Sequence, residues 1–111
     1  MIALRISEAA ALSIVEQADY YQQAAGIALA QGWEAAVDQA VRSLLNWPER
    51  GARCRFRSPA LAGLRWVFVP GFPKHMVFYR YLPQDQTILV VQVLHGARDL
   101  ETVLDEDMEQ G

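Results

Sequence analysis

The sequence predicts an α+β domain in which an antiparallel helical hairpin packs on an antiparallel sheet. Apolar residues recur at helical spacing through the first half of the chain, and alternating residues separated by turn signals predict consecutive strands from Leu64 onward. The 111 residues are 52% hydrophobic and 21% charged, which suits one globular domain with its own buried core and leaves no room for a second domain. We therefore expect residues 1–111 to form a single domain.

The first half is predicted to contain a short strand and two helices. Residues 2–6 form the strand, Ser7 marks the start of the first helix, and Gly26 ends that helix. A second helix follows almost at once and stops at Asn46 and Pro48, so the two helices form an antiparallel hairpin. The residues expected to face inward are Ala11, Ile14, Val15, Ala18 and Tyr21 in the first helix and Ala30, Trp33, Val37, Ala40, Val41, Leu44 and Leu45 in the second.

The second half is predicted to contain an antiparallel meander. A loop-rich crossover holds one extended piece, residues 53–57, and is followed by strands at 64–69, 75–82 and 87–94. In the middle strand, one face carries His75, Val77, Tyr79 and Tyr81, and the other carries Met76, Phe78, Arg80 and Leu82. The last strand is β-branched and almost uncharged, which indicates a strand covered on both faces, and Gln92 is its one polar interior residue.

A short helix is predicted at the C-terminus. Gly96 is expected to adopt an unusual backbone angle, and Asp99 can cap a helix that places Leu100, Val103 and Leu104 inward. The acidic tail after this helix is expected to fray.

Charge is distributed unevenly along the chain. The net charge is −3, yet residues 50–100 are basic. This half therefore suits an anionic partner, either an acidic protein segment or phosphate. Its cations are Arg50, Arg53, Arg55, Arg57, Arg65, Lys74, Arg80 and Arg98, opposed only by Asp85 and Asp99.

Several classes of protein are disfavoured. The longest apolar run, residues 88–91, is far shorter than the roughly 20 residues that span a bilayer, and no signal peptide is visible. We expect a soluble cytoplasmic chain with no membrane partner. Two separated histidines and the single Cys54 predict no metal site, and no glycine-rich phosphate loop follows a strand, so no cofactor is expected.

Two motifs carry a family resemblance. The first is Gly71-Phe72-Pro73-Lys74-His75 leading into Val77-Phe78-Tyr79, and the second is residues 93–99. Weaker matches are Tyr20-Tyr21, Leu44-Leu45 with Pro48, and Ser58-Pro59 with Leu64-Arg65. In their order and spacing these residues resemble the ParE-like branch of the ParE/RelE toxin superfamily of type II toxin–antitoxin modules. The resemblance covers nearly the whole chain.

The resemblance implies a cytoplasmic toxin that inhibits DNA gyrase by binding it. It also implies a hetero-oligomer with a ParD-like antitoxin, whose disordered tail folds across the sheet and the helical hairpin. The toxin alone is not expected to bind a specific nucleic-acid sequence. Members of the RelE-like branch share the fold but cut messenger RNA in the ribosome, and a degenerate module without toxicity is a third possibility.

Cleavage of RNA needs a group that activates the 2′-hydroxyl, a cation at the phosphate and an acid for the leaving oxygen. The available residues are Arg65, Arg80 and His95. Met76 stands where cutting relatives carry arginine, however, and an acidic helix replaces their terminal tyrosine. We therefore expect a toxin that is not an enzyme and has no catalytic residues.

The residues expected to bind the antitoxin or the target are Arg53, Arg55, Arg57, Arg65, Trp66, Arg80, His95 and Arg98. Structural roles compete with binding at several positions. His95 could orient a turn and Arg98 could pair with Asp99, while His75 is expected to be partly exposed. Cys54 is expected to be inert, because no base is placed for it. Trp33 and Trp47 are expected to form core or groove walls.

Overall fold

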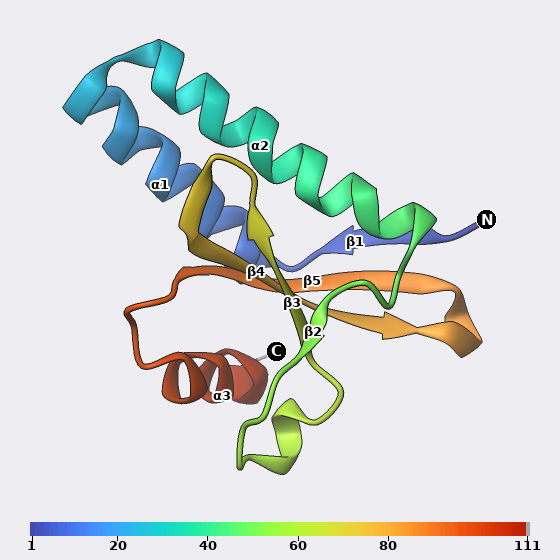
Figure 1. Cartoon of the computed structure of the whole chain (residues 1–111). Helices are drawn as coiled ribbons and strands as arrows, with labels where there is room; N and C mark the ends of the chain where they lie inside the picture. Colours follow the sequence, from blue (N-terminus) through green and yellow to red (C-terminus); the bar gives the residue numbers. More distant parts are fainter. Residues whose placement is uncertain (111) are drawn as a thin grey trace.

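The computed structural model describes residues 1–110 and contains one mixed sheet covered by helices on both faces. The elements are β1 (Ala3–Ile6), α1 (Glu8–Ala25), α2 (Ile27–Asn46), β2 (Ala52–Arg53), β3 (Arg65–Val69), β4 (Phe72–Leu82), β5 (Thr87–His95) and α3 (Leu100–Gln110). Short 3₁₀ turns lie at Pro59–Leu61 and Pro83–Asp85. The strand order is β1-β5-β4-β3-β2, as Figure 1 shows.

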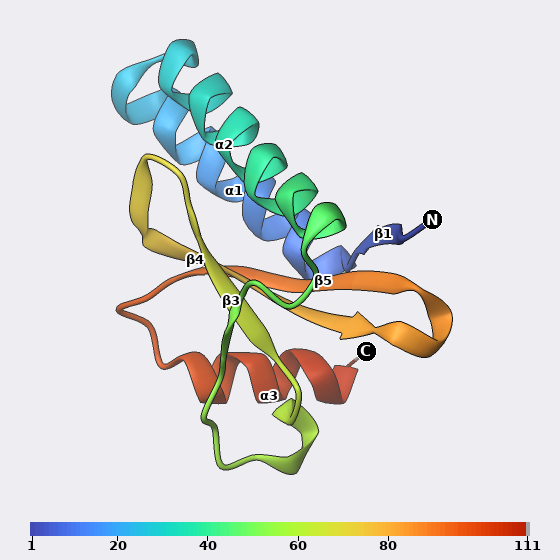
Figure 2. The same ribbon diagram turned by 45° about the vertical axis from the view of Figure 1, so that its right-hand side comes forward.

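The predicted α+β fold is confirmed. Strands β3, β4 and β5 form the antiparallel meander, and β1 adds a parallel strand to β5, with Ile6 opposite Val90. The α1–α2 hairpin lies on one face of the sheet and α3 on the other (Figures 1 and 2). No helix in the described part of the chain combines the length and the apolar character that crossing a membrane requires.

Two hydrophobic cores lie on the two faces of the sheet. The larger one joins α1 and α2 to the sheet and contains Trp33, Val77 and Tyr79. The smaller one joins the sheet to α3 and to the turn at residues 59–61, and it contains Phe78 and Leu104. The predicted alternation along β4 is therefore correct, and β5 is buried on both sides as expected.

The inward stripe of α1 differs from the prediction. Ala10 and Ala18 are buried and Ile14 and Tyr21 pack on the larger core, whereas Ala11 and Val15 are exposed, Val15 by 54%. Neighbouring apolar stripes on one helix are nearly equivalent in sequence. The sheet and α2 together select the stripe whose alanines let the backbones approach closely.

The crossover and the C-terminal segment also differ. Only Ala52–Arg53 pair as a strand, because the chain then turns toward α3, where Glu101 accepts hydrogen bonds from the backbone N–H groups of Arg57 and Ser58. The expected fraying of the tail is wrong. Helix α3 runs to Gln110, and Asp105 accepts a bond from the Ser58 hydroxyl at 2.6 Å.

Gly96 is needed for space and not for backbone angle. The glycines with positive φ are Gly26, Gly63 and Gly71, so the unusual angle expected at Gly96 is wrong. A Cβ atom at Gly96 would lie 3.3 Å from the Sδ atom of Met76, so a larger residue there would require the Met76 side chain to shift by a few tenths of an ångström.

The Tyr79 hydroxyl fastens the loop between α2 and β2 to the larger core. It accepts a hydrogen bond from the Gly51 N–H at 2.9 Å and donates one to the Pro48 carbonyl at 2.8 Å. Arg65 donates to the carbonyl oxygens of Glu49 and Gly51 at 3.0 and 2.8 Å. Burial raises the pKa of Tyr79, so its hydroxyl remains a donor at neutral pH.

Tyr79→Phe is expected to lower the free energy of unfolding by about 1–3 kcal/mol, because the buried Gly51 N–H loses its acceptor. Urea denaturation monitored by tryptophan fluorescence measures the change. The matched control is Tyr20→Phe. Tyr20 is 63% exposed, so loss of its hydroxyl should leave the free energy of unfolding nearly unchanged. An equal effect of the two substitutions would contradict the role of Tyr79.

Candidate functional site

The three residues considered for RNA cleavage do not come together. Arg65 lies opposite Tyr79 in the β3–β4 pairing and so shares the face covered by the helical hairpin, whereas Arg80 is on the other face. His95 lies opposite His75, four residues along β4 from Tyr79, which corresponds to about 13 Å at the usual rise of a strand. Both arginines are also engaged with backbone: Arg80 donates to the Ala60 carbonyl, and Arg65 to the loop described above.

The remaining arginines lie on the surface. Arg53, Arg55 and Arg57 are exposed, while Cys54 and Phe56 between them pack toward the smaller core. Arg98 is exposed and does not pair with Asp99, whose carboxylate instead accepts a bond from the Thr102 hydroxyl at 2.9 Å.

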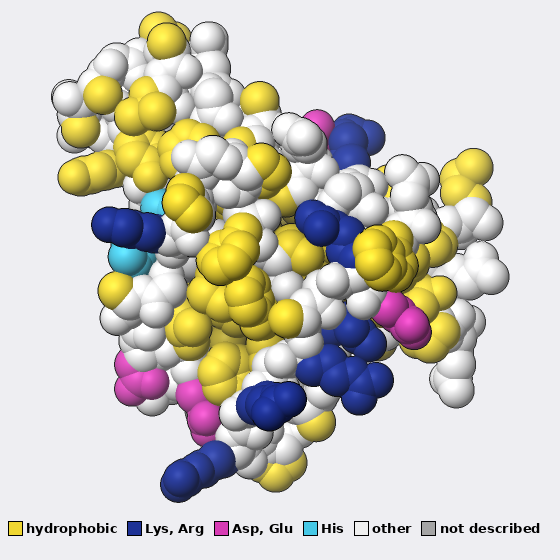
Figure 3. Space-filling view, in the orientation of Figure 1, with side chains coloured by type: hydrophobic (Ala, Val, Ile, Leu, Met, Phe, Trp, Pro, Cys, Tyr) yellow, Lys and Arg dark blue, Asp and Glu magenta, His cyan; other side chains and the backbone are white. Residues whose placement is uncertain are grey.

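Trp66 belongs to an apolar patch on the face that α3 only partly covers. Its ring meets that of Phe68 edge-on at a centroid distance of 4.7 Å, and Phe68 is 51% exposed. Figure 3 shows hydrophobic side chains gathered in the middle of this face with Lys and Arg side chains around them. Helix α3 packs on the smaller core at this face, so the sheet face is only partly open. Trp47, expected in the core or a groove wall, is 64% exposed, whereas Trp33 is fully buried.

One edge of β5 is unpaired along half its length. Strand β1 ends opposite Val90, so among residues 1–110 no strand lies beside Val91–His95 on that side. Side chains form hydrogen bonds with some of the backbone groups at this unpaired edge. The Ser7 hydroxyl donates to the Val91 carbonyl at 2.7 Å, and the Val93 N–H donates to the Gln92 side-chain oxygen at 2.9 Å.

Three adjoining hollows follow this edge between β5 and α1. The first, of about 670 Å³, has Leu12, Ser13 and Val91 in its lining. The second, of about 230 Å³, shares Ser13 with the first and includes Glu16, Val93 and Arg98. The third, of about 550 Å³, shares Gln17, Tyr20, His75 and His95 with the second. Together they form a groove that we call the α1–β5 groove.

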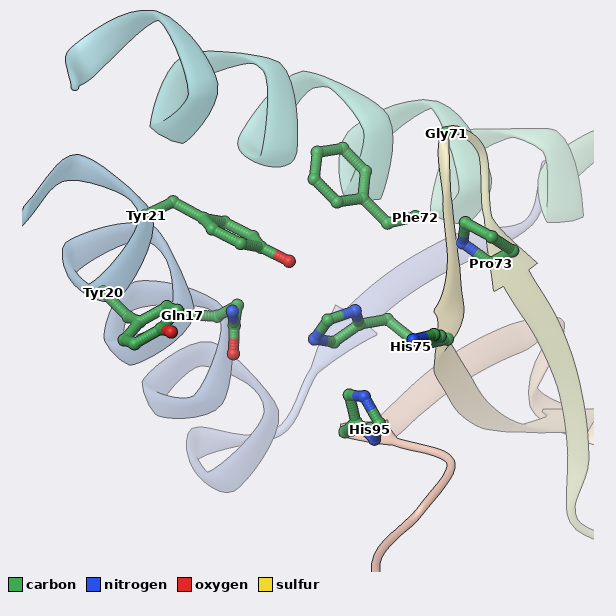
Figure 4. A pocket seen from close by; sticks show the side chains of 9 residues that line it. Gln17, Tyr20, Tyr21, Gly71, Phe72, Pro73, His75 and His95 are labelled. Atoms are coloured by element: carbon green, nitrogen blue, oxygen red, sulfur yellow. The ribbon is translucent and has the colours of Figure 1, made fainter. Parts of the chain in front are cut away.

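The two histidines of the chain meet at the end of this groove (Figure 4). Their ring centroids are 5.2 Å apart, and His75 also contacts Trp33 at 4.7 Å. His75 is only 7% exposed, so the expectation of partial exposure is wrong: the Trp33 and Tyr21 rings cover it. Burial lowers the pKa of His75, and the neighbouring His95 lowers it further.

His95 has the structural role considered from the sequence. Its Nδ1 atom accepts a hydrogen bond from the Ala97 N–H at 3.0 Å, so it orients the turn before α3. The Nε2 atom of His75 is buried and has no hydrogen-bond partner within the described residues. Within residues 1–110 no three His, Cys, Asp or Glu side chains are grouped so that they could hold a metal ion.

Sequence reasoning named His95 and Arg98 as binding residues, but it missed others that line the α1–β5 groove, such as Ser13 and Gln17. Gln92 gave a signal as the only polar residue inside an apolar strand: its amide nitrogen donates to Asp107 at 2.9 Å and its oxygen caps the Val93 N–H. Gln17 gave no signal, because a glutamine on an amphipathic helix is ordinary until a neighbouring strand faces it.

Cys54 is expected to react slowly with iodoacetamide at pH 7, because burial raises the pKa of its thiol to about 11 from its ordinary value of 9.0. The thiolate fraction is then about 100-fold smaller than in an open peptide. Labelling followed by mass spectrometry gives the rate, which should increase up to pH 10 and beyond, and the urea-unfolded chain is the control. Equally rapid labelling of the folded and unfolded chain at pH 7 would contradict the burial.

Comparisons with known proteins agree with the geometry. The family model "ParE toxin of type II toxin-antitoxin system, parDE" matches residues 4–100. Among solved structures, a chain of the chromosomal ParDE system from P. aeruginosa is similar with a TM-score of 0.70 and 18% identity, over 86% of this chain and 96% of that one. No curated protein sequence matches.

Two RelE-type structures share the fold at lower similarity. A chain of the RelBE2 toxin–antitoxin complex from Mycobacterium tuberculosis has a TM-score of 0.61 and 19% identity, covering 87% of this chain and 93% of that one. The isolated RelE toxin of E. coli has a TM-score of 0.56 and 13% identity, covering 99% and 98%. These similarities show the fold, and the match over residues 4–100 shows the family. The chain belongs to the ParE toxin family of type II toxin–antitoxin systems.

Proposed function

We propose that this toxin acts by binding DNA gyrase, without catalytic turnover, and that a ParD-like antitoxin neutralises it. The observation that carries the proposal is the separation of Arg65 from Arg80 on opposite faces of the sheet. A phosphate at one face cannot contact both guanidinium groups, so stabilisation of a cleavage transition state by this pair is disfavoured. Membership of the ParE family supports the same choice.

The antitoxin tail is proposed to lie in the α1–β5 groove. An extended segment can add to an unpaired strand edge through main-chain hydrogen bonds, and the backbone of Val91–His95 offers such an edge. Exposed apolar side chains flank it on α1, with Leu12 exposed by 58%. A solved relative is a ParDE system and another is a RelBE2 complex, which supports a partner of this class.

A ribosome-dependent ribonuclease is the second candidate, favoured by the similarity to the isolated RelE toxin along 99% of this chain. A module that has lost toxicity is the third. Expression of the toxin without an antitoxin tests this third candidate, because unimpaired growth of the host cells would support a loss of toxicity.

Purified toxin is expected to inhibit supercoiling by purified gyrase and to leave messenger RNA intact in a translating extract. Both assays use the same preparation, with and without the antitoxin encoded beside the toxin, which should restore supercoiling. Arg80→Ala is the matched variant in the messenger RNA assay, because a ribonuclease would lose RNA cleavage with this substitution. Cleavage of ribosome-bound transcripts with unaltered supercoiling would overturn the proposal.

Leu12→Asp is expected to weaken antitoxin binding at least 10-fold, because it places a charge in the apolar part of the groove without touching the core. Titration calorimetry with the antitoxin measures the affinity. Gln23→Asp is the matched control, since Gln23 is exposed on the same helix and does not line the groove. Equal affinities of the two variants would place the antitoxin elsewhere.

A further inference from the structure

The hollow at the His75 end of the α1–β5 groove has aromatic walls and a basic interior. Tyr20 and Tyr21 of α1 and Phe72 of β4 form the walls, and Figure 4 shows both imidazole rings directed into the space between them. Its volume is about 550 Å³, which suits one or two side chains of a partner. Tyr21 also packs on the larger core, whereas Tyr20 is 63% exposed and offers its ring to a partner.

The buried Nε2 atom of His75 lacks a partner. Almost all buried polar atoms in folded proteins form a hydrogen bond, because leaving one unpaired is unfavourable. His75 is 7% exposed and its ring borders the hollow. The Nε2 atom is closed to solvent, so the His75 ring must turn slightly before a polar group of a ligand in the hollow can supply the missing partner.

The charges around His75 favour an anion as that polar group. Lys74 of β4 lies in the same lining, and Arg98, which follows β5, lies in the adjoining one. From α1 the charged or titratable groups are Glu16, Tyr20 and Tyr21, and His95 ends β5. The two linings thus contain two cationic side chains and two imidazoles, but only one carboxylate, that of Glu16. A cationic ligand would meet net repulsion despite the aromatic walls.

We propose that this hollow binds a carboxylate side chain of the antitoxin tail, next to an aromatic or aliphatic side chain that packs on Tyr20, Tyr21 and Phe72. The carboxylate accepts a hydrogen bond from an imidazole N–H and lies within reach of the Lys74 charge. This assignment deepens the proposed function and rests on it for the identity of the partner. It assigns to His75 and Tyr20-Tyr21 a role in recognition.

Binding should be linked to uptake of a proton. A carboxylate beside the His75 imidazole stabilises its protonated form, so the bound state holds more protons than the free state near neutral pH. Affinity for the carboxylate should therefore increase as the pH falls from 8 to 6, and it should decrease again once the carboxylate itself is protonated. Glu16 opposes this effect only weakly, because it is exposed.

The test uses 3-phenylpropionate as the probe and the full chain labelled with ¹⁵N-histidine. Titration followed by NMR should shift the imidazole resonances of both histidines, with at least 10-fold tighter binding at pH 6 than at pH 8. The neutral isostere 3-phenylpropionamide should bind at least 10-fold more weakly at pH 6. Arg5→Gln is the control variant, since Arg5 is exposed on β1 and outside the hollow.

His75→Gln and His95→Gln should each reduce binding of the probe at least fivefold. His95 is only partly buried, so His95→Gln keeps the test valid if His75→Gln does not fold. Equal binding of the amide would overturn the proposal in favour of an uncharged apolar slot. Equally tight binding of inorganic phosphate would overturn it in favour of a general cationic patch, and failure of the probe to bind would also overturn it.

The antitoxin complex separates this inference from the function on which it rests. If the carboxylate site and the proposed function are both correct, the affinity of the wild-type toxin for its antitoxin increases at lower pH, and His75→Gln removes most of that pH dependence while the complex still forms. An antitoxin that binds with no pH dependence contradicts the carboxylate site alone. Failure of the wild-type toxin to bind any antitoxin contradicts the proposed function, while the result with the probe still stands by itself.

Discussion

The pairing of β4 with β5 in the middle of the sheet is the constraint on which the rest of the structure depends. Both strands are buried on both faces, and Val77, Phe78, Tyr79, Ile88 and Val90 have no exposed surface. Fully burying one such side chain contributes about 1.5–3 kcal/mol. A shift of register by one residue would move every side chain of a strand to the opposite face and so exchange the contents of the two cores, which makes the observed register strongly preferred. The same register places His75 opposite His95 and directs Arg65 and Arg80 to opposite faces.

Ser7 connects the start of α1 to the availability of the β5 edge. Its hydroxyl accepts a bond from the Ala10 N–H as the helix cap and donates one to the Val91 carbonyl. The chain must leave the sheet at this residue to begin the helix, so β1 cannot extend beyond Ile6. The departure of the chain at Ser7 therefore creates both the unpaired edge of β5 and the groove along α1. A partner strand would pair with β5 in the same row as β1, beyond Ile6.

Gln92 lies where several parts of the molecule meet. Its side chain links β5 to Asp107 of α3 and also satisfies the Val93 N–H at the unpaired edge. Exposed strand edges invite pairing with other chains, and a side chain that occupies the edge donor limits this. The Gln92 side chain therefore links the unpaired edge of β5 to α3 through two hydrogen bonds.

The sequence alone determined the order and type of the elements, because hydrophobic period, caps and turns are local properties. Ser7, Gly26, Asn46 with Pro48, and Asp99 marked the helix boundaries well, and alternation in residues 75–82 assigned both faces of β4. Local pattern could not choose between adjacent stripes on α1, nor show that the chain leaves the sheet after Arg53. These depend on which neighbours compete for the same surface.

The candidate site was predicted only in part for the same reason. The sequence showed that residues 71–75 and 93–99 matter together, and it supplied the family. Only the tertiary structure decided that His75 is buried against Trp33, that Tyr20 and Gln17 face the same hollow, and that Arg65 and Arg80 are apart. The distance and burial of groups far apart in the chain follow from packing and strand register, which no single stretch of residues contains.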